Sequence, residues 1–180
     1  ISKLCNHNIA NIEYSLRLEK YIKSLKQDII LYLAAQSLVR NSNSDPLKTW
    51  RFNVMGTVNL LNSLLQLQNK CAVVIVTTDK VYENQECNFS YREIAPLGGH
   101  DPYSSSKAAV EVATASWRNP FFGGNNIILL ATAQAGNPIG YGYWSKDELI
   151  PEMVRYLSVG EVILDRNCNA LRPWQHVLAP

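Results

Sequence analysis

The sequence predicts an α/β fold built on a doubly wound parallel sheet. Two apolar runs, 28–35 ("DIILYLAA") and 72–78 ("AVVIVTT"), are rich in Ile and Val and contain no alternating polar residues. That pattern is typical of parallel strands buried on both faces. A third run of this kind, 127–133 ("IILLATA"), follows a turn-forming "GGNN". Each pair of runs is far enough apart for a helical crossover, so helices and strands should alternate.

Apolar residues at helical spacing fill the segments around these strands. A helix is expected over about 12–25, before the first strand. Between the first two strands, apolar residues recur every three or four positions over 47–65, which predicts an amphipathic helix of about five turns. Another helix is expected from Ser104 to Trp117, ahead of the third strand. After Pro138 the pattern changes to a Gly- and aromatic-rich loop.

Two short elements are expected beyond that loop. A helix should begin near Leu149, and a short strand should cover 162–164. Neither repeats nor low-complexity tracts interrupt the 180 residues, and 47% hydrophobic composition is enough for a packed core.

Charge and cysteine content argue against several classes of partner. Seventeen basic and fifteen acidic residues give a net charge of +2 and are scattered, so no nucleic-acid or membrane-surface partner is implied. No apolar run reaches the ~18 residues of a membrane span. The four cysteines lie far apart without a C-x-x-C pair, and no signal segment opens the chain. We therefore expect a reduced, cytoplasmic setting and no metal site.

A polar triplet, Thr78-Asp79-Lys80, follows the second strand directly. Ligands of open parallel sheets bind at the carboxyl ends of the strands, where this triplet offers a hydroxyl, a carboxyl and an amine. The same residues are also typical of a helix cap or turn.

A second polar cluster opens the third helix in "HDPYSSSK", where Tyr103 precedes Lys107 by one helical turn. An ammonium beside a phenol lowers the phenol's pKa from about 10, so this tyrosine could accept a proton near neutral pH. The other interpretation is a solvated, polar helix start. The first and third strands end in Ala34-Ala35 and in "AGN" (135–137), which allow a ligand to approach closely.

Long strings resemble one family. "TTDKVYEN", "GGHDPYSSSKAAVE", "AGNPIG" and "LRPWQHVLAP" are similar to sequences of nucleotide-sugar 4,6-dehydratases within the extended short-chain dehydrogenase/reductase family. The lysine of "TTDK" makes the chain resemble the members that act on CDP-D-glucose, because related enzymes carry glutamate at this position. The similarity covers nearly the whole chain from about Asn8.

The resemblance implies an NAD-dependent reaction that converts CDP-D-glucose to CDP-4-keto-6-deoxy-D-glucose and water. Tyr103 would remove the proton of the 4-hydroxyl, and Lys107 would lower the pKa of Tyr103 and hold the nicotinamide ribose. Thr78 would bind the developing 4-keto oxygen. Lys80, with a pKa lowered by desolvation, would take the C5 proton, and Asp79 would protonate the departing 6-hydroxyl.

The resemblance also implies binding residues. For NAD these are Asn8, where the family has an adenine-contacting aspartate, and Ala34, Ala35 and Gln36, with Tyr103 and Lys107. For the sugar nucleotide they are Asn137, Trp144, Arg172, Trp174 and His176. Trp174 could instead pack in a core.

One family feature is missing from the sequence. No G-x-x-G-x-x-G turn for the pyrophosphate occurs, so we expect weak cofactor binding. We interpret the chain as the central fragment of a dehydratase, from an incomplete or a decaying gene. It should hold a truncated NAD-binding, Rossmann-like domain (1–137) lacking its first βαβ unit and the start of a substrate-binding lobe (138–180). The strand over 28–35 should then be an exposed sheet edge.

Two alternatives remain beside the dehydratase. The chain could be a related nucleotide-sugar epimerase or reductase, although simple epimerisation does not need the acid and base of Asp79 and Lys80. It could also be a non-catalytic remnant that binds a sugar nucleotide or a partner subunit. The family further implies a homodimer through the helices over 47–65 and 104–117.

Overall fold

The computed structural model describes residues 5–85, 89–124, 127–140, 142, 144–163 and 172–179. The chain divides into two compact units, Ile1–Ala133 and Gln134–Pro180. Each unit is described by itself. The assignment of 1–137 to cofactor binding and of 138–180 to substrate binding stays a prediction.

The first unit is built on a three-stranded sheet of order β1-β2-β3. The strands are β1 (Ile29–Tyr32), β2 (Cys71–Thr78) and β3 (Ile128–Ala135). β1 and β2 are parallel, with Ile29 opposite Ala72. The Cys71 N–H donates to the Ile127 carbonyl at 2.8 Å, which brings the starts of β2 and β3 together. The three apolar runs therefore form strands as predicted, and the α/β class is confirmed.

Helical segments connect and flank the strands, and the longer ones lie where the sequence predicts helix. The predicted 47–65 helix is one helical stretch with a π-helical middle, whereas α2, η2 and η3 were not expected. The elements are α1 (Ser15–Leu25), α2 (Val39–Ser44), α3 (Pro46–Trp50), η1 (Arg51–Met55), α4 (Gly56–Leu64), η2 (Asp79–Val81), α5 (Pro102–Trp117) and η3 (Arg118–Phe122).

The helix ends follow local chemistry. Asp45 caps α3 by accepting the Lys48 N–H at 3.0 Å, and Pro46 occupies the first helical position, where a missing N–H costs nothing. α1 ends at Lys26, whose backbone is left-handed with φ of 46°.

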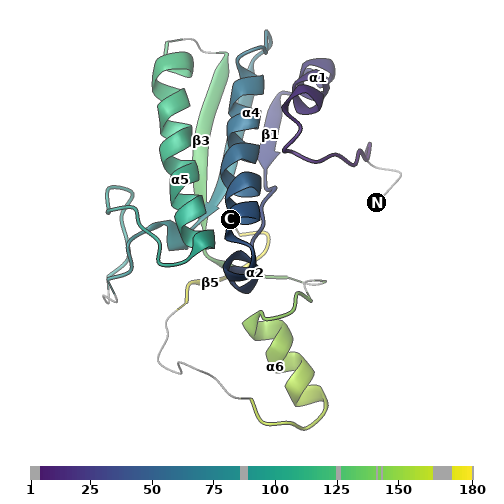
Figure 1. Cartoon of the computed structure of the whole chain (residues 1–180), viewed down its shortest axis with the longest axis vertical. Helices are drawn as coiled ribbons and strands as arrows, with labels where there is room; N and C mark the ends of the chain where they lie inside the picture. Colours follow the sequence, from purple (N-terminus) through teal and green to yellow (C-terminus); the bar gives the residue numbers. More distant parts are fainter. Residues whose placement is uncertain are drawn as a thin grey trace. The chain divides into compact units, whose positions relative to one another are not determined.

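Helices α1, α4 and α5 lie on one face of the sheet (Figure 1). The core forms between that face and α4, which buries one side of itself through Leu60, Leu61 and Leu64. From the sheet, Val73 and Ile75 are fully buried, and Val110 contributes from α5. These residues alternate along β2, as expected for a strand that presents every second side chain to a helical layer.

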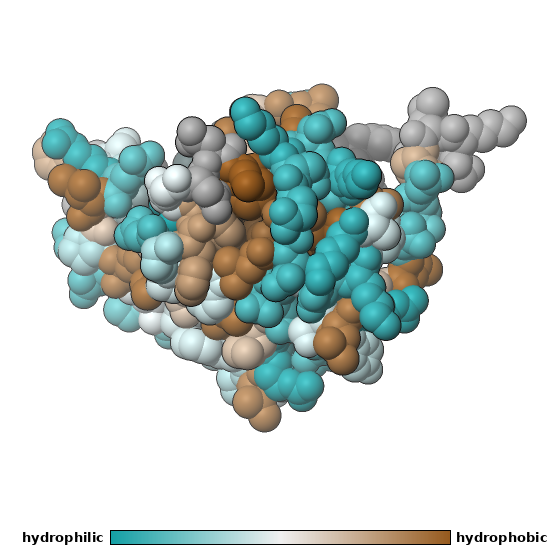
Figure 2. Space-filling view, turned by 90° about the horizontal axis from the view of Figure 1, so that it is seen from above, coloured by the Kyte–Doolittle hydropathy of each residue, from teal (hydrophilic) through white to brown (hydrophobic). Residues whose placement is uncertain are grey.

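The opposite face of the sheet is largely bare in the described part of the chain. Ile29, Leu31 and Leu33 on or just after β1 are 62–68% exposed, and Leu129 on β3 is 61% exposed. The expectation that these strands are buried on both faces is therefore wrong for β1 and β3. The expectation that the first strand is a sheet edge is confirmed by the strand order. Hydrophobic patches interrupt the hydrophilic surface in Figure 2.

The second unit pairs two strands that the sequence did not predict, β4 (Asn137–Ile139) and β5 (Trp174–His176), in parallel. Its helix α6 (Leu149–Ser158) begins where expected. Gly136 permits the close pairing, because a Cβ there would lie 2.6 Å from the Pro173 carbonyl oxygen. The predicted 162–164 strand is wrong for Val162 and Ile163, which have no regular structure, and Leu164 lies outside the described residues.

None of the helices in the described ranges is long and apolar enough to cross a membrane.

Candidate active site

The turn that follows β2 is held by its own side chains. The Thr78 hydroxyl donates to Asp79 Oδ1 at 3.0 Å and accepts the Lys80 N–H at 3.4 Å. Thr78 is buried, whereas Asp79 and Lys80 are half-buried. The triplet therefore acts as a turn cap, as one interpretation of the sequence expected, and the same bonds fix its three functional groups at the carboxyl end of the central strand.

A capping box fixes the start of α5. The Asp101 carboxylate accepts the Tyr103 and Ser104 N–H groups at 2.9 and 3.0 Å, and the Asp101 N–H donates back to Ser104 Oγ. Pro102 occupies the first helical turn. The serines of "HDPYSSSK" thus serve mainly to begin the helix, which leaves the tyrosine and the lysine as the residues not explained by capping.

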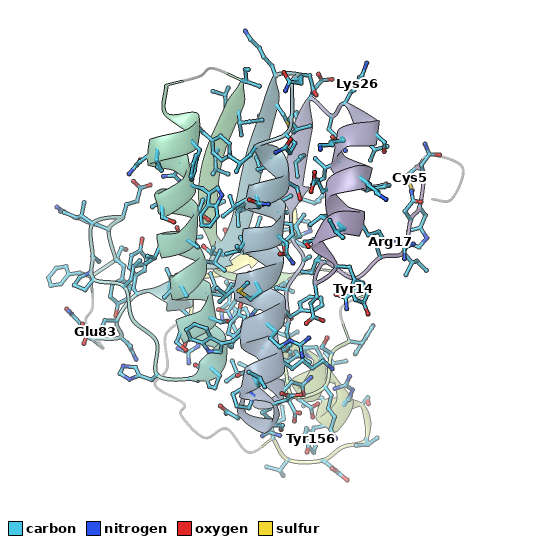
Figure 3. All side chains as sticks on the ribbon, turned by 45° about the horizontal axis from the view of Figure 1, so that its top comes forward. Cys5, Tyr14, Arg17, Lys26, Glu83 and Tyr156 are labelled. Carbon is cyan, nitrogen blue, oxygen red and sulfur yellow. The ribbon has the colours of Figure 1, made fainter. Side chains whose placement is uncertain are left out.

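Two glycines bring the long loop after η2 against this helix start. The Gly98 N–H donates to the Val81 carbonyl at 2.8 Å. A Cβ on Gly99 would lie 2.4 Å from the Ser105 backbone nitrogen, so only glycine fits there. The loop, marked by Glu83 in Figure 3, lies beside α5 on the side away from α1. The "GG" in the family-like string therefore joins η2 to the start of α5.

Tyr103 and Lys107 both lie buried on α5, which packs against β2 and η2. Lys80 Nζ from η2 is 6.0 Å from the centre of the Tyr103 ring, within cation–π range. Lys107 Nζ donates to the Val76 carbonyl of β2 at 3.0 Å. The structure therefore gathers the two polar clusters of the sequence, the triplet after β2 and the pair on α5, in one region.

Burial changes the acid–base behaviour of Lys107. Desolvation lowers its pKa to about 8, and the nearby Glu111 carboxylate opposes that shift by favouring the charged ammonium. Lys107 is therefore mostly charged at neutral pH and loses its proton within the mildly alkaline range. A charged Lys107 is what the predicted role, stabilising an anionic Tyr103, requires.

A buried asparagine missed by the sequence analysis connects the first strand to α5. Asn53 accepts the Gln36 N–H at 2.8 Å and donates to the Gln36 carbonyl at 3.1 Å. Its amide also donates to Ser106 Oγ at 2.9 Å. Asn53 lies beside the apolar stripe of the predicted 47–65 helix, so no local signal marked it, although a buried amide needs partners.

The residues expected near a cofactor occupy different settings. Ala34, Ala35 and Gln36 are half-buried just after β1, and Gln36 is also bonded to Thr49 and Leu38. Asn8 is exposed and donates to the Tyr21 hydroxyl at 2.9 Å. The small Ala34 and Ala35 and the buried Lys107 amine fit the nicotinamide-ribose end of NAD. The glycine-rich turn that would hold its pyrophosphate does not occur among the 180 residues.

The second unit contains the residues expected to bind the sugar nucleotide. Asn137 lies opposite Trp174 in the β4–β5 pair, and its N–H donates to the Pro173 carbonyl at 3.1 Å. Trp174 is 41% exposed and so is not a core residue of this unit. His176 Nδ1 accepts the Leu178 N–H. Arg172 is also exposed.

Trp144 lies apart from that strand pair in sequence, ahead of α6. Its side chain is 56% exposed, and its carbonyl accepts a hydrogen bond from the Arg155 guanidinium. The exposure leaves the ring available for a ligand.

The chain is similar to known proteins along nearly its whole length. The sequence model of the family described as GDP-mannose 4,6 dehydratase matches residues 3–178. The chain is 42% identical over its whole length to CDP-glucose 4,6-dehydratase of Salmonella typhimurium and covers 51% of that protein. It is 26% identical to UDP-glucose 4-epimerase of Mycoplasma pneumoniae and covers 54% of it. The chain thus spans about half the length of the curated relatives it matches.

Solved structures show the same fold. A dTDP-glucose 4,6-dehydratase from Streptomyces venezuelae, with NAD and TYD bound, superposes with a TM-score of 0.80 at 27% identity, covering 93% of this chain and 49% of that one. The UDP-glucose 4-epimerase of Thermotoga maritima reaches a TM-score of 0.81 at 16% identity, covering 93% of this chain and 53% of that one. At that identity the second match establishes the fold alone.

Proposed function

The chain belongs to the GDP-mannose 4,6 dehydratase family, and from this membership we propose that it carries the catalytic residues of a nucleotide-sugar 4,6-dehydratase acting on CDP-D-glucose with NAD. The observation that carries the proposal is the meeting of the Thr78-Asp79-Lys80 turn with buried Tyr103 and Lys107. The substrate class is taken from the CDP-glucose relative, to which this chain is 42% identical over its whole length.

Each residue has one task in this proposal. Tyr103, as the phenolate, takes the proton of the sugar's 4-hydroxyl, and Lys107 stabilises that anion because its ammonium is charged at neutral pH. The Thr78 hydroxyl, now bonded to Asp79, turns to donate to the C4 carbonyl oxygen once it forms. NAD, when bound, supplies hydride acceptance from C4 and hydride return to C6.

Elimination of water needs a base for the C5 proton and an acid for the departing 6-hydroxyl. A C4 ketone makes the C5 proton acidic, so an amine at Lys80 can remove it while the Asp79 carboxyl gives its proton to the departing 6-hydroxyl. These two residues are adjacent in η2 and share the Thr78 cap, so both are positioned by one turn. Epimerisation at C4 involves no loss of water and gives this acid–base pair no task.

The proposed binding residues form one set for NAD and another for the sugar nucleotide. We propose that Ala34, Ala35 and Gln36 line the nicotinamide end of NAD, with Asn8 near the adenine, and that Asn137, Trp144, Arg172, Trp174 and His176 bind the sugar nucleotide. Arg172 suits a pyrophosphate, because guanidinium offers paired donors in a plane. We also propose a homodimer through the helical stretch 46–64 and α5, each of which exposes apolar side chains such as Leu47 and Val112.

The direct test is to incubate the purified chain with NAD and CDP-D-glucose and to follow loss of one water from the sugar by mass spectrometry. UDP-, GDP- and dTDP-glucose serve as matched controls for the base. We expect water loss with the cytidine nucleotide in preference to the others, at a low rate because the pyrophosphate turn is not among these residues. A C4 epimer without water loss would replace the dehydratase with the epimerase.

A further inference from the structure

Two neighbouring residues of β2 are bonded to two residues one turn apart on α5. The Val76 carbonyl accepts from Lys107 Nζ at 3.0 Å. The next side chain, Thr77, donates its hydroxyl to the Glu111 carboxylate. These paired bonds lie immediately before the Thr78-Asp79-Lys80 turn, so they fix the register of α5 on the strand that carries the turn.

The two hydrogen bonds also hold side chains of opposite charge, Lys107 and Glu111, in a region with little access to solvent. Lys107 is 7% exposed and Thr77 is 4% exposed, and Glu111 is half-buried one turn beyond Lys107. Burial lowers the pKa of Lys107 to about 8, and Glu111 is the charge that works against this shift. The Thr77 hydroxyl holds the Glu111 side chain against β2, because a carboxylate oxygen accepts its hydrogen bond.

Other titratable groups lie on α5 and on the elements packed against it. β2 carries Cys71 alone and α4 carries none. The remaining elements packed against α5 contribute Arg40 from α2, Lys48 from α3, Arg51 from η1, Asp79 and Lys80 from η2, and Arg118 from η3. On α5 itself the other titratable group is Tyr103.

We propose that Glu111 is a positioning residue whose carboxylate, held by Thr77, keeps Lys107 charged one turn from Tyr103 and locks α5 in register on β2. The proposal deepens the proposed function and rests on it for its catalytic meaning. Glu111 touches neither the sugar nor NAD in this account. It acts through Lys107, and it sets the upper pH at which the tyrosine–lysine pair can work.

The test is the NMR titration of the Lys107 side chain in the 180-residue chain, with no substrate present. Glu111→Gln removes the charge and keeps an oxygen that can accept from Thr77. We expect its Lys107 midpoint to fall by about half a pH unit or more, the effect of one unit charge a helical turn away even in a watery dielectric. The control Glu93→Gln removes one negative charge from an exposed site and should leave the midpoint unchanged.

A second variant separates charge from packing. Thr77→Val removes the hydroxyl donor and keeps the carboxylate, so we expect faster hydrogen exchange along α5 with a smaller change in the Lys107 midpoint. An unchanged midpoint in Glu111→Gln would overturn the proposal, and so would an equal shift in Glu93→Gln or a larger one in Thr77→Val. The titration does not require the chain to eliminate water, so it tests the role of Glu111 separately from the proposed function.

Discussion

Asn53 donates its side-chain amide to Ser106 Oγ at 2.9 Å, and both residues are at most 1% exposed. The same amide group holds both backbone polar groups of Gln36, just after β1. One side chain thus joins the end of the first strand to the helix that carries Tyr103 and Lys107. The bond spans 53 residues of sequence, so the proposed cofactor side and the proposed catalytic side of the site depend on the same residue.

Asn53→Ala should lower the free energy of unfolding by about 1–3 kcal/mol, because the Gln36 N–H and carbonyl and the Ser106 hydroxyl lose a buried partner. Chemical denaturation measures this change. Asn43→Ala, on an exposed position of α2, is the control and should change stability by less than about 0.5 kcal/mol. Equal losses in both variants would show that the network adds nothing.

Gly99→Ala should destabilise the chain by about 1–3 kcal/mol, since the new Cβ would meet the backbone of Ser104 and Ser105 rather than a movable side chain. Gly124→Ala is the matched control, because a Cβ there has nothing within 4 Å. The two unfolding midpoints in urea give the comparison. If Gly99→Ala is as stable as the control, the loop after η2 does not rest on α5 as described.

Buried Lys107 should make stability depend on pH. Its pKa is about 8 when folded, against 10.5 when unfolded, so the unfolded chain binds one more proton between these values. Stability contributed by this residue therefore rises as pH increases through 8, by about 2 kcal/mol up to pH 9.5.

Lys107→Met removes this dependence and is the comparison for the wild type. The unfolding free energy of the wild type minus that of Lys107→Met, measured from pH 7 to 9.5, should increase as pH rises. The upper limit of pH 9.5 avoids the titration of Tyr32. Burial raises the pKa of Tyr32 to about 12, so stability falls once the same tyrosine ionises in the unfolded chain near pH 10. A constant difference across the range would mean that Lys107 is not desolvated.

The bare sheet face should make the chain self-associate. Leu31 projects from edge strand β1 and is 62% exposed, next to other exposed apolar side chains of that face. Leu31→Lys should reduce association beyond the proposed dimer in light scattering, because a charge on an edge strand opposes strand-to-strand association. Its control is Leu16→Lys on α1, which is 74% exposed and lies outside the helices proposed for the dimer. Association that is unchanged in Leu31→Lys would contradict this prediction.

Much of the fold could be predicted from local signals. The runs ending in Thr78 and Ala133 had the composition of strands, and helices were predicted over 47–65 and 104–117 that the structure confirms. Strands β4 and β5 could not be predicted, because three residues carry no periodicity and their pairing joins positions 37 residues apart. Exposure of Ile29 and Leu129 was missed for a related reason, since an apolar run does not say which layer covers it.

The candidate site was predicted unevenly. Thr78 could be named because polar residues directly follow an apolar strand, and Tyr103 because a lysine follows it at helical spacing. Asn53, Thr77 and Glu111 could not be named, because their importance lies in contacts between distant segments. Residues proposed to take part in the reaction leave a local pattern in the sequence, whereas the residues that position them are found only from their packing.

The most direct measurement of the central claim uses a chimera in which this chain replaces the matching 51% of the Salmonella typhimurium CDP-glucose 4,6-dehydratase. The chimera and its Lys80→Met variant are each given CDP-D-glucose, and bound NAD and loss of water are followed together. The account predicts that the chimera eliminates water and that Lys80→Met keeps NAD but loses elimination by at least about 100-fold, the effect of removing a general base. A folded, NAD-bound chimera with no water loss, or unchanged elimination in Lys80→Met, would contradict it.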